Sequence, residues 1–288
     1  MITFREFLYQ TRGIFINANI PEARLEAEII LSNELKVARH RLYAFQNETL
    51  TAQQIENLGI IVARRIKREP LAYILGHREF YGIDLQVSPS VMVPRPETEL
   101  LVERTLLVCL ERLEKGSFVV VDVGTGSGCI AITLAMHLPM CTVLAVDISQ
   151  EALDVARINV RNHHLEERVT LMQSDLLDKV DGPVDVIVGN LPYIPTDRID
   201  QLSPEVRSEP RTALDGGQDG MDQLRRLLSQ SVTKLAPMAT VLLEIDPGQS
   251  LGLKKATMGL FGDAMISVEQ DLAGLERLFV LELPSEDS

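Results

Sequence analysis

The chain has 288 residues, a formal net charge of −13, and 45% hydrophobic against 24% charged residues. This is the composition of a globular protein with a sizeable core, and it excludes an intrinsically disordered chain. A protein that holds nucleic acid by its phosphates needs a basic face. The acidic surplus therefore favours a small molecule or a basic protein as partner and predicts no direct binding of nucleic acid.

Length and cysteine usage set further limits. Single domains usually have roughly 100–200 residues, so this length predicts about two domains. The three cysteines, Cys109, Cys129 and Cys141, are an odd number without the spacing of a metal site. They predict no metal and a reducing, cytoplasmic location. No apolar run reaches the roughly 18–20 residues of a membrane-spanning helix, so we expect no membrane partner.

Residues 1–75 predict a small helical-bundle domain. Thr3-x-x-Glu6 and Thr51-x-x-Gln54 are capping boxes, in which two side chains satisfy the first backbone N–H groups of a helix. The basic run at 64–68 is either the solvated end of the third helix or a local basic patch. No chemistry is apparent in this domain, which we expect to dock the substrate or to support the core.

Residues 76–98 predict a hairpin or extended linker, and residues 99–288 predict a domain of alternating strands and helices. Short apolar runs rich in β-branched residues predict parallel strands at 118–123, 142–147, 169–173, 184–188 and 240–245. Apolar strands that alternate with helices are typical of a mostly parallel sheet covered on both faces. The runs at 265–269 and 278–282 predict an antiparallel C-terminal hairpin at its edge. We therefore expect an α/β, Rossmann-like fold.

A glycine-rich loop follows the first predicted strand and opens a helix. Its residues are Gly124, Thr125, Gly126, Ser127 and Gly128. Glycines at such a turn allow positive φ and let a ligand approach the backbone closely. Cys129 stands where the dinucleotide-binding fingerprint requires its third glycine, which favours a ligand without a pyrophosphate over NAD.

Two carboxylates end the next two strands. Asp147 ends the second strand, from which a carboxylate accepts hydrogen bonds from ribose hydroxyls. Asp175 ends the third, where it can receive an adenine amino group while Leu176 packs on the base. The alternatives are a tight turn without a ligand and, for Asp175, a helix cap. Together with the glycine loop, these residues predict a site for S-adenosylmethionine.

The fourth strand runs into Asn190, Leu191, Pro192 and Tyr193. Ligands of open α/β sheets bind beyond the carboxyl ends of the strands, so we expect this loop beside the glycine loop, with Asn190 also near the cofactor. The Asn190 side-chain oxygen and the Leu191 carbonyl oxygen can accept the two hydrogens of a planar amino group, and Tyr193 can stack on its plane. Two such acceptors can orient a poorly nucleophilic amide nitrogen and stabilise the charge that develops on it. A strand-end turn with a packed tyrosine is the alternative.

These and further motifs resemble the release-factor glutamine methyltransferases over nearly the whole chain. The similar segments are residues 69–76, 78–80, 94–99, 122–128 and 209–214. The resemblance implies a Rossmann-like class I methyltransferase with S-adenosylmethionine as cofactor. It also implies methyl transfer to the side-chain N5 of the glutamine in the Gly-Gly-Gln motif of class I peptide-chain release factors, in support of translation termination. Where the family usually has Asn-Pro-Pro-Tyr, this chain has Leu191, which keeps the carbonyl but loses the fixed φ of proline.

The sequence leaves alternatives for several features. Arg95 and Glu97 either line the pocket or form an ion pair that fixes the linker, and residues 209–211 are expected in a loop over the active site. The chain's own Gly-Gly-Gln at 216–218 raises self-methylation, although a glycine-rich turn is a sufficient explanation. The rival functions are an amino-methyltransferase acting on adenine or cytosine in nucleic acid, and a cofactor-binding protein without catalysis.

Overall fold

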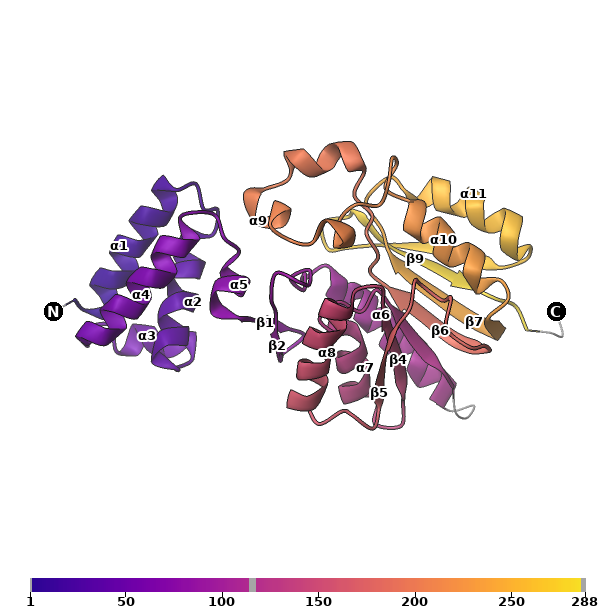
Figure 1. The fold of residues 1–288 in the computed structure, drawn as a ribbon, viewed down its shortest axis with the longest axis horizontal. Coiled ribbons are helices and arrows are strands. Elements are labelled where there is room, and N and C mark those ends of the chain that lie inside the picture. The colour runs from indigo at the N-terminus through magenta and orange to yellow at the C-terminus, as the bar shows by residue number, and fades with distance from the viewer. Residues whose placement is uncertain (1, 114–117, 286–288) are drawn as a thin grey trace. The chain divides into compact units, whose positions relative to one another are not determined.

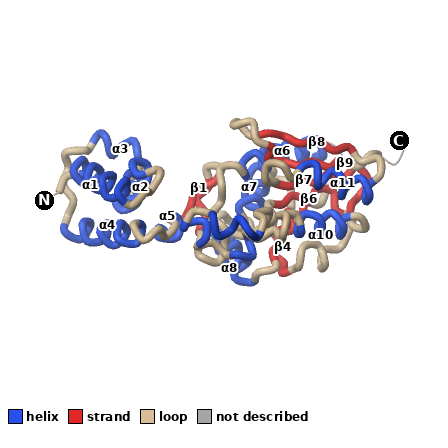
Figure 2. Tube along the Cα trace, turned by 90° about the horizontal axis from the view of Figure 1, so that it is seen from above, coloured by secondary structure: helices blue, strands red, loops and turns tan. Residues whose placement is uncertain are grey.

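The computed structural model describes residues 2–113 and 118–285, which fall into two compact units. The helical unit consists of Met1–His77 together with Ser203–Ser208, and the sheet unit of Arg78–Leu202 and Glu209–Ser288. Figure 1 traces the chain through both units, and in Figure 2 the red strands gather in the sheet unit.

The helical unit is built from short helices whose apolar faces pack against one another. Its N-terminal helices are α1 (Phe4–Asn17), α2 (Ala23–Leu35), α3 (Arg39–Ala44), α4 (Ala52–Arg65) and α5 (Leu71–Leu75). Phe15, Leu42 and Leu58 are fully buried in its core. Both predicted capping boxes form, at Thr3 and at Thr51, and the predicted N-terminal helical region is confirmed.

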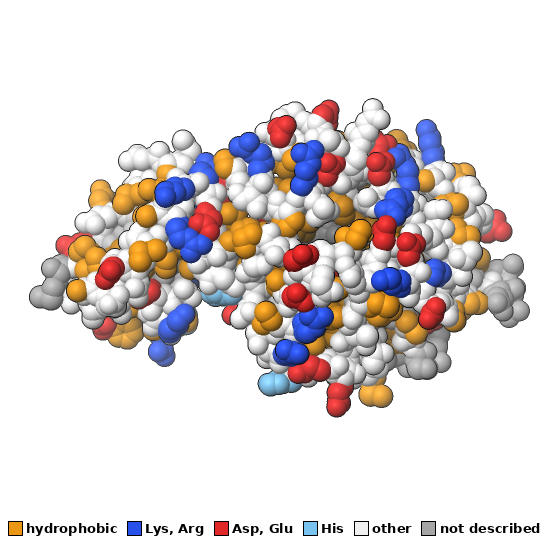
Figure 3. Space-filling model, viewed as in Figure 1, with side chains coloured by type: hydrophobic (Ala, Val, Ile, Leu, Met, Phe, Trp, Pro, Cys, Tyr) orange, Lys and Arg blue, Asp and Glu red, His pale blue; other side chains and the backbone are white. Residues whose placement is uncertain are grey.

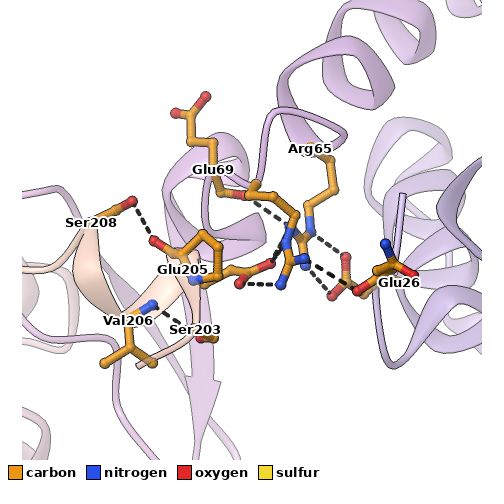
Figure 4. Close-up of polar contacts among 10 residues, drawn as sticks. Glu26, Arg65, Glu69, Ser203, Glu205, Val206 and Ser208 are labelled. Atoms are coloured by element: carbon orange, nitrogen blue, oxygen red, sulfur yellow. Dashed lines mark hydrogen bonds and ion pairs between the residues drawn. The ribbon is translucent and has the colours of Figure 1, made fainter. Parts of the chain in front are cut away.

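A short segment from the middle of the chain belongs to this helical unit. It contains helix α9 (Pro204–Arg207), whose Glu205 binds two arginines near the end of α4. Arg65 Nη1 donates to Glu205 Oε1 over 2.8 Å, and Arg65 Nε donates to Glu26 Oε2 over 2.6 Å (Figure 4). Arg68 donates to both oxygens of Glu205, at 2.5 and 2.7 Å. We call Glu26, Arg65, Arg68 and Glu205 the Arg65 cluster.

The Arg65 cluster accounts for two of the four basic residues at 64–68, Arg65 and Arg68, whereas Arg64 and Lys67 are exposed, as at a solvated helix end. Arg65 is only 2% exposed, so it is not part of a solvated helix end. A buried guanidinium needs compensating charge, which Glu26 and Glu205 supply. Burial would raise the pKa of Glu205, but the hydrogen bonds from Arg68 and Arg65 lower it to about 2.

A hairpin leads from the helical unit into the sheet unit, where the sequence predicted a hairpin or an extended linker. Its strands are β1 (His77–Phe80) and β2 (Ile83–Gln86). Asn159 fastens this hairpin to the glycine loop, because its Oδ1 accepts from the Gln86 N–H at 2.7 Å and its Nδ2 donates to the Ser127 carbonyl at 2.9 Å. Helix α6 (Thr98–Leu113) begins after the proline-containing segment that follows β2.

The sheet unit has seven strands in the order β5-β4-β3-β6-β7-β9-β8. They are β3 (Val120–Val123), β4 (Val143–Asp147), β5 (Val169–Gln173), β6 (Val184–Gly189), β7 (Leu235–Glu244), β8 (Met265–Gln270) and β9 (Glu276–Glu282). Strands β3 to β7 pair in parallel, and β9 is antiparallel to both β7 and β8. The predicted mostly parallel sheet with an antiparallel C-terminal hairpin is confirmed.

Helices cover both faces of this sheet because alternate strand side chains point to opposite faces and are mostly apolar. Val120 and Val186 belong to one core layer, and Val121 and Ile187 to the other. Figure 1 shows the helices of the two layers on opposite sides of the sheet: α6, α7 (Cys129–His137) and α8 (Gln150–Asn162) against α10 (Asp222–Ser231) and α11 (Ser250–Phe261). Within the described ranges, no helix is long and apolar enough to cross a membrane.

Strand β7 begins well before its predicted start. The sequence predicted a strand at 240–245, but β7 begins at Leu235 and ends at Glu244. The added stretch contains Pro237, which usually argues against a strand. The pairing of β7 with β6 is irregular at this point, so the missing N–H of proline breaks no regular ladder.

Candidate active site

The candidate site lies where the winding of the sheet reverses. From β3 the chain moves outward to β4 and β5, and it then returns to the other side of β3 as β6. The carboxyl ends of β3 and β6 therefore frame the crevice in which open α/β sheets bind ligands. The glycine loop (residues 124–128) follows β3, and the reaction loop (residues 190–193) follows β6.

The glycine loop has the left-handed backbone that its glycines permit. The angle φ is 73° at Gly124, 55° at Gly126 and 84° at Gly128. The Gly126 N–H donates to Asp147 Oδ2 and the Ser149 N–H to Asp147 Oδ1, both over 2.9 Å. The pKa of Asp147 is raised by burial, and these two hydrogen bonds offset only part of that rise. The carboxylate at the end of β4 thus holds the loop closed.

A second carboxylate, Asp122 of β3, also binds the glycine loop. No role was predicted for it from the sequence. Its Oδ2 accepts from Thr125 Oγ1 at 2.6 Å and from the Ala131 N–H at 3.2 Å. Burial raises the pKa of Asp122 to about 7. Asp122 Oδ1 and Ser127 Oγ are buried and have no hydrogen-bond partner among the described residues. A lone aspartate inside an otherwise apolar strand was the signal that could have identified it.

Residues from three distant parts of the chain meet behind the reaction loop. Asn190 Nδ2 donates to Thr98 Oγ1 over 3.0 Å, and Thr98 Oγ1 donates to Glu244 Oε2 over 2.7 Å. The Tyr193 hydroxyl donates to the other oxygen of Glu244 over 3.0 Å. Burial raises the pKa of Glu244, and the bonds from Thr98 and Tyr193 oppose that rise. No sequence pattern marked Thr98 or Glu244 as part of the site.

The reaction loop leaves two oxygen atoms for a ligand. Neither Asn190 Oδ1 nor the Leu191 carbonyl oxygen accepts a hydrogen bond from any residue that the structure describes. The Leu191 side chain is 3% exposed and packs against the glycine loop. A Cβ at Gly124 would lie 2.9 Å from Leu191 Cδ2. The two loops are therefore in direct contact.

A cavity of about 500 Å³ opens between these loops, a volume within the usual range for small-molecule sites. Ten of the residues predicted for the site line it: Gly124, Thr125, Gly126, Ser127, Asp147, Asp175, Leu176, Asn190, Leu191 and Pro192. Gly128 and Tyr193 are not in the lining. Gly128 instead allows close packing, because a Cβ there would meet Ile132 at 3.1 Å. Tyr193 lies against the apolar core, with its hydroxyl on Glu244.

Two residues of the cavity lining form an ion pair that was not predicted from the sequence. Asp175 Oδ2 accepts from Arg226 Nη2 of α10 over 2.8 Å. Leu176 lies beside Asp175 and is buried. One oxygen of the Asp175 carboxylate is therefore committed to Arg226.

The loop expected over the active site also contributes to the cavity lining. Pro210 and Arg211 line the cavity, and the short turn η2 (Arg211–Ala213) follows. Arg95 forms an ion pair with the buried Glu209, and neither Arg95 nor Glu97 is in the lining. The ion-pair alternative therefore applies to Arg95, with Glu209 as its partner. It joins the proline-containing segment before α6 to the loop at 209–211.

The chain's own Gly-Gly-Gln forms a tight turn beside the reaction loop. A Cβ at Gly216 would lie 2.7 Å from the Pro192 carbonyl oxygen, and one at Gly217 would lie 1.8 Å from Asp222 Oδ2. Close packing at these two positions accounts for both glycines.

Two family descriptions match separate parts of the chain. The PrmC N-terminal domain matches residues 6–76, and the methyltransferase small domain matches residues 102–204. A release factor glutamine methyltransferase of Geobacter sulfurreducens is 40% identical over 281 residues, which are 96% of this chain and 95% of that protein. The chain belongs to the release factor glutamine methyltransferase family. Another member, from Moorella thermoacetica, is 39% identical over 97% of this chain and 98% of its own length.

Family membership makes the chain a methyltransferase, and a solved structure supports its fold. The crystal structure of a methyltransferase from Pyrococcus furiosus is similar with a TM-score of 0.53 and 19% identity, over 81% of this chain and 100% of that one. The two family matches fall on the helical unit and on the stretch from α6 through the reaction loop. Across the described ranges, no group of three or more His, Cys, Asp or Glu side chains is arranged to hold a metal ion.

Proposed function

We propose that this chain transfers a methyl group from S-adenosylmethionine to the side-chain amide of the glutamine in the Gly-Gly-Gln motif of class I release factors. Relatives named release factor glutamine methyltransferase are similar to this chain over nearly its full length. The observation that carries the chemistry is the pair of uncommitted acceptors, Asn190 Oδ1 and the Leu191 carbonyl oxygen, at the edge of the cavity.

The residues around the cavity fit the proposed cofactor. Gly124, Gly126 and Ser127 offer a backbone that a ligand can approach closely, and Asp147 lies where ribose hydroxyls are bound in related folds. Leu176 and the free oxygen of Asp175 suit an adenine ring and its amino group. Ser127 Oγ is a buried polar atom with no hydrogen-bond partner among the residues that the structure describes, as expected for a ligand contact. When bound, S-adenosylmethionine supplies an electrophilic methyl group on its sulfonium.

The reaction loop can hold a carboxamide by both of its N–H bonds. One hydrogen is accepted by Asn190 Oδ1 and the other by the Leu191 carbonyl, which fixes the plane and direction of the nitrogen. As charge develops on the nitrogen, both oxygens stabilise it without reorganising, because the fold already holds them in place. Stacking of Tyr193 on the amide stays a prediction, since the structure holds its ring against the core.

The surface of the molecule favours a protein substrate over nucleic acid. Figure 3 shows Lys and Arg side chains interspersed with Asp and Glu on the face in view. The chain as a whole carries a net charge of −13. Binding through phosphates requires a continuous basic surface, so an adenine or cytosine amino group in nucleic acid is the less favoured substrate. We place the enzyme in the cytoplasm, which the three free cysteines among the described residues support.

Methyl transfer from labelled cofactor to a purified release factor tests the proposal, with peptide mapping by mass spectrometry. We expect one methyl group on the Gly-Gly-Gln glutamine, and none when that glutamine of the release factor is changed to alanine. In the enzyme, Asn190→Ala should lower turnover on the order of 100-fold, because one of two charge-stabilising acceptors is lost. The assignment is wrong if labelling survives the glutamine change, or if an oligonucleotide is labelled instead.

A further inference from the structure

The orientation of the Asn190 carboxamide decides whether it offers the substrate an acceptor or a donor. Its oxygen and nitrogen have nearly the same shape, so sterics alone do not fix which one faces the cavity. Only Oδ1 can accept an N–H of a substrate amide. Some other contact must therefore hold Nδ2 on the side away from the cavity.

A chain of hydrogen bonds that starts at a buried carboxylate supplies that contact. A Glu244 oxygen that carries no proton can only accept, so the Thr98 hydroxyl must use its single hydrogen to reach Oε2, 2.7 Å away. Thr98 Oγ1 then has only lone pairs left, and Asn190 Nδ2 donates to it over 3.0 Å. The reverse orientation of the carboxamide would bring two oxygens together with no hydrogen between them.

Burial makes this chain of bonds selective. Thr98 and Glu244 are each 1% exposed, so no bulk solvent is available to satisfy a misdirected group. The three residues are distant in sequence, separated by 146 positions for Thr98 and Glu244 and by 92 for Thr98 and Asn190. Each comes from the end of a regular element: the start of α6, the end of β6 and the end of β7.

We propose that Thr98 and Glu244 are positioning residues that hold Nδ2 of Asn190 inward and present its Oδ1 to the substrate amide. The proposal rests on the proposed function for the identity of that amide. Glu244 acts on both sides of the reaction loop, because it also accepts the Tyr193 hydroxyl at 3.0 Å. A single buried carboxylate thereby sets the direction of two side chains of the loop.

The test compares Thr98→Val, which keeps the shape and removes the hydroxyl, with Thr98→Ser, which restores it. Thr98→Val should lower kcat at least about tenfold, because a misdirected carboxamide misplaces the substrate amide, and Thr98→Ser should recover most of the loss. Thr98 also lines the cavity, but its hydroxyl is used by Glu244 and Asn190. Cofactor affinity, measured by calorimetry, should therefore stay within about twofold of wild type, since a tenfold change would need the loss of about 1.4 kcal/mol of contacts. Thr105→Val is the matched control. Thr105 is a buried hydroxyl of the same helix that donates only to the Leu101 carbonyl, so kcat should not change.

A second measurement needs no substrate. In NMR spectra with ¹⁵N-labelled asparagine, the Asn190 side-chain signal is assigned by its loss in Asn190→Ala. We expect slow hydrogen exchange for one Nδ2 hydrogen in the wild type and in Thr98→Ser, and faster exchange in Thr98→Val. If Thr98→Val does not fold, Glu244→Gln serves instead, because its amide can donate to Thr98 and so removes the constraint on Asn190.

The two measurements separate this inference from the proposed function. If the wild type fails to methylate a release factor but shows the protected Asn190 hydrogen, the substrate assignment fails and the positioning role stands. The positioning role is overturned if exchange at Asn190 is unchanged when the constraint is removed, or if Thr105→Val lowers kcat as much as Thr98→Val.

Discussion

Leu191 shows how one residue can serve the site with its backbone and its side chain separately. Its carbonyl oxygen remains available for a ligand, while its side chain is buried against the glycine loop. The family's usual proline would supply the same carbonyl and a fixed φ. In this chain, packing against Gly124 takes over part of that restriction. The departure from the family pattern is therefore compatible with a well-held reaction loop.

Gly124→Ala tests this contact between the two loops. A Cβ at φ 73° costs about 1–2 kcal/mol in the left-handed region, and it would also lie 2.9 Å from Leu191 Cδ2. We expect the affinity for S-adenosylmethionine to fall at least about tenfold, as measured by calorimetry. Gly274→Ala is the matched control, because φ there is 77° and no heavy atom lies within 4 Å of the added Cβ. Equal affinities of the two variants for S-adenosylmethionine would contradict a role for the contact between Gly124 and Leu191.

At the scale of elements, α9 is joined to the helical unit through charges. The segment 203–208 lies in the chain between the reaction loop and the loop at 209–211, yet its contacts place it with α2 and α4. Glu205 accepts from Arg65 and Arg68, and Arg65 is further held by Glu26. The ion pairs of Arg65 and Arg68 therefore hold residues 203–208 to the helical unit, although the chain on either side of this segment belongs to the sheet unit.

Acid should release this segment. The folded-state pKa of Glu205, about 2, lies below the usual unfolded value of about 4.3. Its stabilising contribution is therefore complete above the unfolded value and is lost as the pH falls from there toward 2. Hydrogen–deuterium exchange of residues 203–208, corrected for intrinsic rates, should be about tenfold faster at pH 3 than at pH 5. This factor corresponds to roughly one pK unit of the Glu205 shift, the part that remains after solvent screening. In Glu205→Gln, residues 203–208 should exchange fast at both pH values. If their exchange in Glu205→Gln still depends on pH as in the wild type, Glu205 does not have this role.

At the scale of the whole molecule, the sequence predicted what depends on local pattern. The apolar period of the strands, the capping boxes and the glycine loop each lie within a short window, and the structure has the corresponding elements. Placement of both loops at one edge of the sheet followed from the rule for parallel strands. Most of the residues predicted for the site therefore line a single cavity.

What the sequence could not predict depends on contacts between distant segments. Thr98, Asn190 and Glu244 form a hydrogen-bonded chain only because α6, β6 and β7 end close together. Arg65 and Glu205 are 140 positions apart. No local pattern distinguishes a buried, paired arginine from a solvated one, or a positioning threonine from a helix-capping one. These contacts require the tertiary fold to be known.

The proposed chemistry depends on two oxygens of the reaction loop that hold a carboxamide beside the methyl donor. A crystal structure with S-adenosylhomocysteine and a release-factor domain that carries Gly-Gly-Gln would test it most directly. We expect the glutamine amide nitrogen within hydrogen-bond distance of both Asn190 Oδ1 and the Leu191 carbonyl oxygen, with the cofactor against the glycine loop. A complex in which these oxygens face away from the glutamine, or in which the cofactor lies elsewhere, would contradict it.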